Sequence, residues 1–100
     1  MNKSYAIGYR FQLRVKKYLE KLGWKTVVRP GSKFPDIHCY RKDNICDTPL
    51  WMIIEVECKM NKYLSKDEKI KGEVIKNNGI PFYVAWKDRK TRKIILEERW

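Results

Sequence analysis

Apolar residues recur at intervals of three and four along the first quarter of the chain, which is the spacing of one face of an α-helix. They are Ile7, Phe11, Val15, Leu19 and Leu22. Basic residues fill another face, at Arg10, Arg14, Lys17 and Lys21. The pattern predicts a basic amphipathic helix that ends at Gly23, because glycine readily takes the left-handed conformation at a helix C-terminus.

Three β-type segments follow this helix. The first covers residues 24–29, and the residues that break it are Pro30, Gly31 and Ser32. A short strand is expected over residues 36–40 and a strong, mostly apolar strand over residues 51–59. The stretch between them is expected to be a polar loop, with Asp43, Asn44, Asp47 and Pro49. Together the three segments predict a β-meander.

The second half of the chain opens with a helix signal. Ser65 followed by Glu68 has the spacing of a capping box, so a helix should begin there and run to about residue 77 or 78, before Gly79. Gly72 inside it weakens the helix by about 1 kcal/mol. Two short strands are expected over residues 82–86 and 93–96.

The predicted order of elements is therefore α-β-β-β-α-β-β. This order favours a mixed α/β fold, with a central five-stranded mixed sheet that is flanked by helices. The chain has 100 residues, of which 43% are hydrophobic and 13% aromatic, which is enough for one hydrophobic core. We expect a single domain over residues 1–100.

The charge of the chain points to its class of partner. Lys and Arg number 23 against 12 Asp and Glu, a formal net charge of +11. Such an excess favours a polyanion as partner, although a merely solvated basic surface is the alternative. The basic residues run along the whole chain instead of clustering beside one apolar face, which argues against membrane binding.

The sequence also suggests where the protein works. It has no run of roughly 18 apolar residues, and residues 1–8 lack the apolar core of a signal peptide. The cysteines, Cys39, Cys46 and Cys58, form no CxxC pair, so neither a disulfide framework nor a zinc ribbon is indicated. We expect a cytoplasmic protein with reduced, mostly buried thiols.

Candidate chemistry lies at the ends of two predicted strands, where Asp36 follows Pro35 and Glu57 is followed by Lys59 after one residue. Side chains at i and i+2 share a strand face, so Glu57 and Lys59 should project together with Glu55. If Asp36 lies on the neighbouring antiparallel strand, its carboxylate can approach that of Glu57.

Two converging carboxylates repel each other, yet they suit a hard divalent cation such as Mg²⁺. The metal would activate a water molecule, while Lys59 would orient the nucleophile and offset negative charge on a phosphate. The alternative is a purely structural role, because Glu and Lys that alternate on a strand form salt bridges and a Pro-Asp step opens many turns. Charges at the end of so apolar a strand favour a site.

Several residues fall in the order seen in archaeal Holliday junction resolvases, which are PD-(D/E)XK nucleases. They are Gly8 with Gln12, Gly23-Trp24, Arg29, Gly31-Ser32, Pro35-Asp36-Ile37, the segment 54–59, Tyr63-Leu64-Ser65 and the segment 83–87. The resemblance implies a restriction-endonuclease-like core, a homodimer and dependence on Mg²⁺ or Mn²⁺. It also implies paired nicks in opposing strands of a four-way DNA junction, in an archaeal or virus-infected cell.

The resemblance also implies roles for particular residues. Asp36 and Glu57 resemble the metal ligands of these enzymes, the backbone carbonyl of Cys58 a further ligand, and Lys59 the catalytic lysine. Arg29 and Ser32 resemble residues that contact the substrate near the scissile phosphate, and Ser32 is included among the catalytic candidates. For Ser32, a turn residue after Pro30-Gly31 is an equal alternative.

Two positions depart from the family pattern. Gln12 stands where these enzymes usually have a glutamate, and it keeps a carbonyl oxygen but loses the charge, so the metal would be held less strongly or the contact would pass through water. Glu55 is an additional acid, which either compensates for Gln12 or pairs with a nearby lysine. We favour the ion pair.

Three further sets of residues have open roles. His38 shares the face of Asp36, and a structural role is favoured over that of a general base. The tryptophan rings could stack on unpaired bases. For Trp51 and Trp86 we favour a place in the core or in a dimer interface instead. For Trp24 and Trp100 both roles stay open. Contacts with DNA phosphates are expected from Arg10, Arg14, Lys17 and Lys33.

Three functions remain open. The first is a structure-selective endonuclease that acts on branched DNA. The second is a DNA-binding module of the same fold that cuts weakly or not at all, as Gln12 suggests. The third is a nuclease of this fold that acts on other DNA, such as flaps or foreign duplex.

Overall fold

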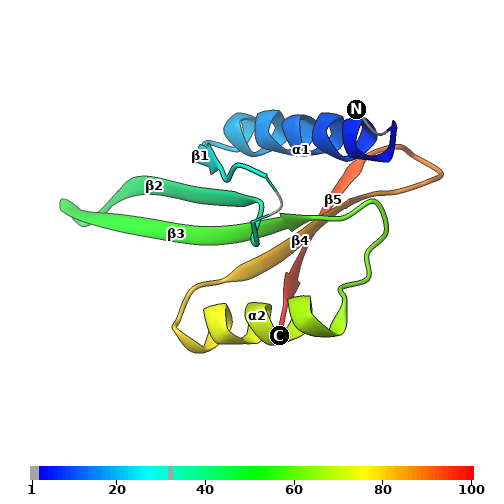
Figure 1. Cartoon of the computed structure of the whole chain (residues 1–100). Coiled ribbons are helices and arrows are strands. Elements are labelled where there is room, and N and C mark those ends of the chain that lie inside the picture. The colour runs from blue at the N-terminus through cyan, green and yellow to red at the C-terminus, as the bar shows by residue number, and fades with distance from the viewer. Residues whose placement is uncertain (1–2, 32) are drawn as a thin grey trace.

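The structure is a computed structural model that describes residues 3–31 and 33–100, with residues 3–5 described by their backbone alone (Figure 1). Its elements follow the predicted order. They are α1 (Lys3–Lys21), β1 (Lys25–Val28), β2 (Ile37–Ile45), β3 (Thr48–Cys58), α2 (Lys66–Asn77), β4 (Phe82–Lys87) and β5 (Ile94–Arg99). The predicted α-β-β-β-α-β-β arrangement is thus confirmed.

The five strands form one mixed sheet in the order β1-β2-β3-β4-β5. β1, β2 and β3 are antiparallel neighbours, which confirms the predicted meander. β3 and β4 are parallel, and β5 returns antiparallel to β4. A parallel pair needs a long crossover connection, and α2 with its flanking loops supplies it.

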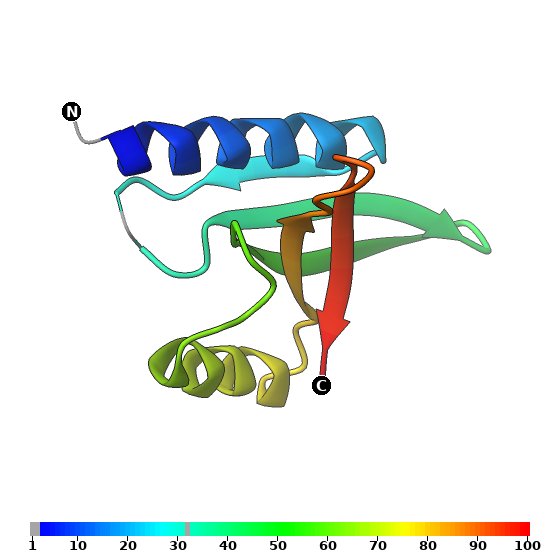
Figure 2. The ribbon, with the colours of Figure 1, turned by 90° about the vertical axis from the view of Figure 1, so that its right-hand side faces the viewer.

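The two helices cover opposite faces of the sheet, α1 on one side and α2 on the other (Figure 2). The face under α1 holds the larger hydrophobic core, to which α1 contributes Phe11, Val15 and Leu19. Ile54 and Val56 of β3 join this core. The alternate residues Glu55 and Glu57 point to the other face, as the strand period requires.

A second cluster lies on the α2 face, where Leu64, Phe82 and Val84 are buried. Trp86 packs against it, as predicted. Trp51, in contrast, is 60% exposed, so its predicted place in the core is wrong and its place in a dimer interface stays a prediction. Gly72 is buried in α2, and a Cβ there would lie 2.8 Å from the ring of Trp100 and 3.0 Å from that of Phe82, so a larger residue would not fit unless a ring moved.

The predicted polar loop between β2 and β3 is wrong. Asp43 and Asn44 belong to β2 and Pro49 belongs to β3, so the two strands form a hairpin that projects beyond the rest of the sheet (Figure 1). The turn is Cys46-Asp47, with φ values of 51° and 64°. Positive φ at both central residues is typical of a two-residue hairpin turn. Because the hairpin is solvated there, its strands need no buried apolar residues.

The C-terminal end of α1 and the free thiols follow the predictions, apart from the exposure of one cysteine. After α1, Gly23 has the predicted left-handed backbone, with φ of 100°. Cys39, Cys46 and Cys58 are free thiols, but Cys46 is exposed because it lies at the hairpin turn. Within the described part of the chain, no helix has the length and apolar character that crossing a membrane requires.

Candidate active site

A cavity of about 670 Å³ opens where α1, the sheet and the start of α2 meet. Its lining comes from five separate segments of the chain. They supply Gly8, Tyr9 and Gln12; Val28, Arg29, Pro30 and Gly31; Asp36; Glu57 and Cys58; and Glu68. The candidate residues Asp36, Glu57, Cys58, Gln12 and Arg29 therefore share one cavity.

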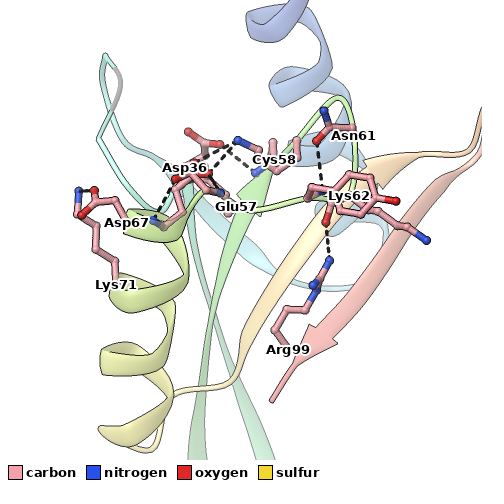
Figure 3. Close-up of polar contacts among 12 residues, drawn as sticks. Asp36, Glu57, Cys58, Asn61, Lys62, Asp67, Lys71 and Arg99 are labelled. Atoms are coloured by element: carbon pink, nitrogen blue, oxygen red, sulfur yellow. Dashed lines mark hydrogen bonds and ion pairs between the residues drawn. The ribbon is translucent and has the colours of Figure 1, made fainter.

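The strand register brings Asp36 and Glu57 together. Asp36 directly precedes β2, and the pairing of Ile37 with Val56 places it opposite the end of β3. The Asp36 N–H donates to Glu57 Oε1 at 3.1 Å, and the Cys58 N–H donates to Asp36 Oδ2 at 2.9 Å. Figure 3 shows the three residues converging at the end of β3, beside the first turn of α2. The two carboxylates meet as the alternation of residues predicted.

Ionisation of both Asp36 and Glu57 is unfavourable unless a cation is bound. Glu57 is 6% exposed, and burial, with Asp36 as the second cause, raises its pKa to about 9. Glu57 therefore keeps its proton at neutral pH unless a cation compensates the second negative charge. The Cys58 thiol also stays neutral, because burial raises its pKa.

The oxygen donors at this point of the cavity suit a hard divalent cation. Within residues 6–31 and 33–100, no group of three His, Cys, Asp or Glu side chains is arranged to hold a metal ion. Asp36 and Glu57 are the two carboxylates that meet here, and the third in the lining, Glu68, is paired with Lys59, so a further ligand would be a neutral oxygen or water. Gln12 lies in the lining, and its buried Nε2 has no hydrogen-bond partner among the described residues. Because Nε2 is a donor, it would meet an acceptor such as water or a phosphate oxygen, whereas a cation would be met by the Gln12 Oε1 atom.

Lys59 lies one residue beyond β3, where its N–H donates to the carbonyl of Ala85 at 2.9 Å. Its ammonium Nζ pairs with Glu68, at 3.0 Å from Oε1 and 3.2 Å from Oε2. Burial alone would raise the pKa of Glu68, but the N–H of Ser65 and the Lys59 ammonium outweigh it and lower that pKa to about 2.

Glu68 was recognised in the sequence only as a helix cap. The predicted capping box is confirmed, since the Ser65 N–H donates to Glu68 Oε1 and the Glu68 N–H to Ser65 Oγ. The same carboxylate lines the cavity and reaches Lys59 and Glu57. The signal available in the sequence was an acid in the first turn of the helix that follows the Glu57-Lys59 strand.

Glu55 forms an ion pair, the role that we expected for it, but its partner is Arg29 and not a lysine. Arg29 approaches Glu55 Oε2 at 2.8 Å, and His38 Nδ1 contacts Glu55 Oε1. Arg29 also donates to the carbonyl of Pro35 at 2.9 Å, directly before Asp36. The buried Glu55 carboxylate therefore ties the end of β1 to the segment that carries Asp36.

The residues expected to contact DNA lie in several places. Arg10, Arg14, Lys17 and Lys33 are exposed. Arg14 reaches the carbonyl of Arg92 in the β4–β5 turn at 3.5 Å, and together with Lys17 it lines a separate surface depression. Arg14 and Lys17 thus line a different part of the surface from the cavity that holds Gln12. Ser32 lies outside the described residues.

Comparison with known proteins gives one structural match. No family model and no curated protein sequence matches the chain. The solved structure of Hjc from Archaeoglobus fulgidus, a Holliday junction resolvase from an archaeal hyperthermophile, matches with a TM-score of 0.64 and 25% sequence identity. The match covers 91% of this chain and 71% of that one. The chain therefore has a fold like that of a Holliday junction resolvase.

Proposed function

We propose that the chain is a metal-dependent endonuclease that cuts four-way DNA junctions. The observation that carries the proposal is the meeting of Asp36 and Glu57 in one cavity, with Lys59 paired to Glu68 of the same cavity, on a resolvase-like fold. Paired acids suit the binding of a divalent cation, and a nearby lysine can offset negative charge on the phosphate during metal-assisted hydrolysis. The whole chain, residues 1–100, acts as a single nuclease domain.

Asp36 and Glu57 would hold the metal, Mg²⁺ or Mn²⁺, with the carbonyl oxygens of Cys58 and Gln12 as further candidate ligands. When bound, the cation supplies Lewis-acid activation of water and of the scissile phosphate. The backbone amides of Asp36 and Cys58 orient the two carboxylates through the hydrogen bonds already described. Rigid support of this kind keeps ligands in place before the substrate arrives.

Lys59 supplies the proposed catalytic charge. Its side chain is 26% exposed and pairs with Glu68, which lines the cavity, so we expect its ammonium to meet a phosphate that enters there. A fixed cation at that place stabilises negative charge that develops on the phosphate during hydrolysis. Arg29, whose charge is already engaged by Glu55, would contact the substrate only with the donors that this ion pair leaves free.

Branched DNA is the proposed substrate, and a homodimer the proposed assembly. The net charge of +11 favours a polyanion, and Arg10, Arg14, Lys17 and Lys33 would contact phosphates. One chain offers one Asp36-Glu57 pair, so paired nicks in opposing strands need two copies. Exposed apolar side chains on α2 and the hairpin supply a surface for such a contact. They include Trp51, Ile53, Ile70 and Val74.

The proposal is tested by incubating the protein with a labelled four-way junction and with linear duplex of the same sequence. We expect symmetric nicks in the junction with Mg²⁺ or Mn²⁺, and none with a chelator. Equal cutting of junction and duplex would leave a nuclease but remove the preference for branched DNA, and would favour flaps or foreign duplex as substrates.

Gln12 favours one second candidate, a junction-binding protein with weak catalysis. A neutral amide stands in the cavity where the resemblance leads us to expect a carboxylate. The variant Gln12→Glu separates the two candidates, because a third carboxylate strengthens the hold on a divalent cation. If the natural protein binds junctions without cutting and Gln12→Glu cuts, the second candidate is correct.

A further inference from the structure

The proposed catalytic lysine is paired with an acid that belongs to the first turn of α2. We propose that Glu68 is a positioning residue that holds the Lys59 ammonium at the cavity and so makes the start of α2 part of the active site. The inference rests on the proposed function, because it assigns Lys59 a part in the reaction. It concerns a residue for which the sequence indicated only a helix cap.

Lys59 needs a partner if its ammonium is to stay in one place. Hydrogen bonding of its N–H to Ala85 fixes the backbone, but a lysine side chain has four rotatable bonds and loses much rotamer freedom when it is immobilised. Both oxygens of Glu68 lie within 3.2 Å of Nζ. The pair is only partly exposed, 26% for Lys59 and 20% for Glu68, so water screens it less than a surface pair.

Glu68 can serve as an anchor because it is itself held. Oε1 accepts the Ser65 N–H at 2.8 Å, and the backbone N–H of Glu68 donates to Ser65 Oγ at 3.2 Å. The N-terminal end of a helix also favours a negative charge. The Ser65 N–H thus holds the carboxylate itself, while the Ser65 hydroxyl holds the backbone of Glu68, and the ammonium that the carboxylate binds is placed accordingly.

The alternative role for Glu68, that of a metal ligand, agrees less well with these contacts. Its oxygens are engaged by Lys59 and by the Ser65 amide, whereas Asp36 and Glu57 each accept one backbone N–H and face each other in the cavity. A ligand role would require Glu68 to release Lys59. The geometry thus favours positioning.

Two neighbouring residues provide matched controls. Asp67 lies one residue earlier and pairs with Lys71 at 3.1 Å, but its side chain is 75% exposed. Figure 3 shows Asp67 and Lys71 on the side of α2 that is turned away from Glu57. Asp67→Asn therefore removes a charge from the same helical turn without touching the site. Ser65→Ala removes one half of the capping box and leaves the carboxylate of Glu68 in place.

Glu68→Gln is the informative variant, because glutamine also suits the third helical position of a capping box. It keeps the cap and removes the charge that holds Lys59. We expect its single-turnover rate of junction cleavage in Mg²⁺ to fall by about tenfold or more, since a small displacement of a reacting group costs rate steeply. Junction affinity and the Mg²⁺ concentration that gives half the rate should stay unchanged. Asp67→Asn and Ser65→Ala should cut at the wild-type rate.

A second readout does not depend on activity. Acylation of lysines with a limiting amine reagent, followed by mass spectrometry, reports how well each ammonium is shielded by its partner. We expect Lys59 to be modified faster in Glu68→Gln than in the wild type, and equally in Asp67→Asn and the wild type. If the wild type cuts no DNA and the labelling still changes in this way, the proposed function fails and the positioning of Lys59 stands.

The inference is overturned by any of three results. The first is cleavage by Glu68→Gln at the wild-type rate. The second is an equal loss of rate in Ser65→Ala, which would trace the effect to the helix cap. The third is unchanged labelling of Lys59 in Glu68→Gln.

Discussion

Glu57→Gln should make the metal-free protein more stable, although it removes a proposed metal ligand. Glu57 is 6% exposed and faces Asp36. Its pKa rises from 4.5 to about 9, first because of burial and second because of Asp36. Between these values the folded state holds a proton that the unfolded state has released. Stability must therefore fall as pH rises from 4.5 towards 9.

At pH 7 the stability lost is set by how far the pH lies above the unfolded-state pKa of 4.5, because the folded-state pKa of about 9 is higher than 7. The difference between 7 and 4.5, at about 1.36 kcal/mol per pH unit, corresponds to about 3 kcal/mol. Glutamine has the shape of a protonated glutamate. Its amide oxygen can accept the Asp36 N–H, and its NH₂ group can donate to the Asp36 carboxylate. Glu57→Gln should thus recover most of that free energy.

The assay is urea unfolding in chelator at two pH values. At pH 7 the variant should exceed the wild type by up to about 3 kcal/mol in free energy of unfolding, and at pH 5 by less than about 1 kcal/mol. Glu73→Gln, the same change at an exposed position of α2, should show no such pH dependence. Added Mg²⁺ should stabilise the wild type but not Glu57→Gln. A variant that is less stable than the wild type at pH 7, or a gain that is equal at both pH values, would refute the reasoning.

Two further predictions concern stability. Glu55→Gln weakens the buried contacts with Arg29 and His38 and should lower the free energy of unfolding by about 2 kcal/mol, measured in urea; an unchanged value would show that the network does not hold the Asp36 segment. Gly72→Ala should gain about 1 kcal/mol of helix propensity but lose as much or more, because its Cβ meets Trp100 and Phe82. In a Trp100→Ala background most of that loss should disappear, so additive effects in this pair would contradict the packing account.

Much of the site followed from local rules. Strand alternation predicted that Glu55 and Glu57 share one face and that Ile54 and Val56 share the other, and the register then brought Asp36 to Glu57. The start of α2 followed from Ser65 and Glu68, whose capping box is a contact between near neighbours. Such features depend on residues close in sequence or on a single strand pair.

The rest depended on contacts that local patterns do not contain. The hairpin turn at Cys46-Asp47 lacks the glycine or asparagine that usually marks such turns, so β2 and β3 were predicted too short. The partners of Glu55 come from the end of β1 and from β2, and only the assembled sheet brings them to its carboxylate. Glu68 reaches Lys59 because the connection after β3 folds back, which no periodicity reveals.

We propose that Asp36 and Glu57 together hold the metal that drives cleavage of branched DNA. The decisive measurement is the single-turnover rate of four-way junction cleavage in Mg²⁺ for the wild type, Asp36→Asn and Glu57→Gln at saturating protein. We expect a wild-type rate that a chelator abolishes, and a loss of at least about 100-fold in each variant, with junction binding retained. Cleavage at the wild-type rate by either variant would contradict the claim.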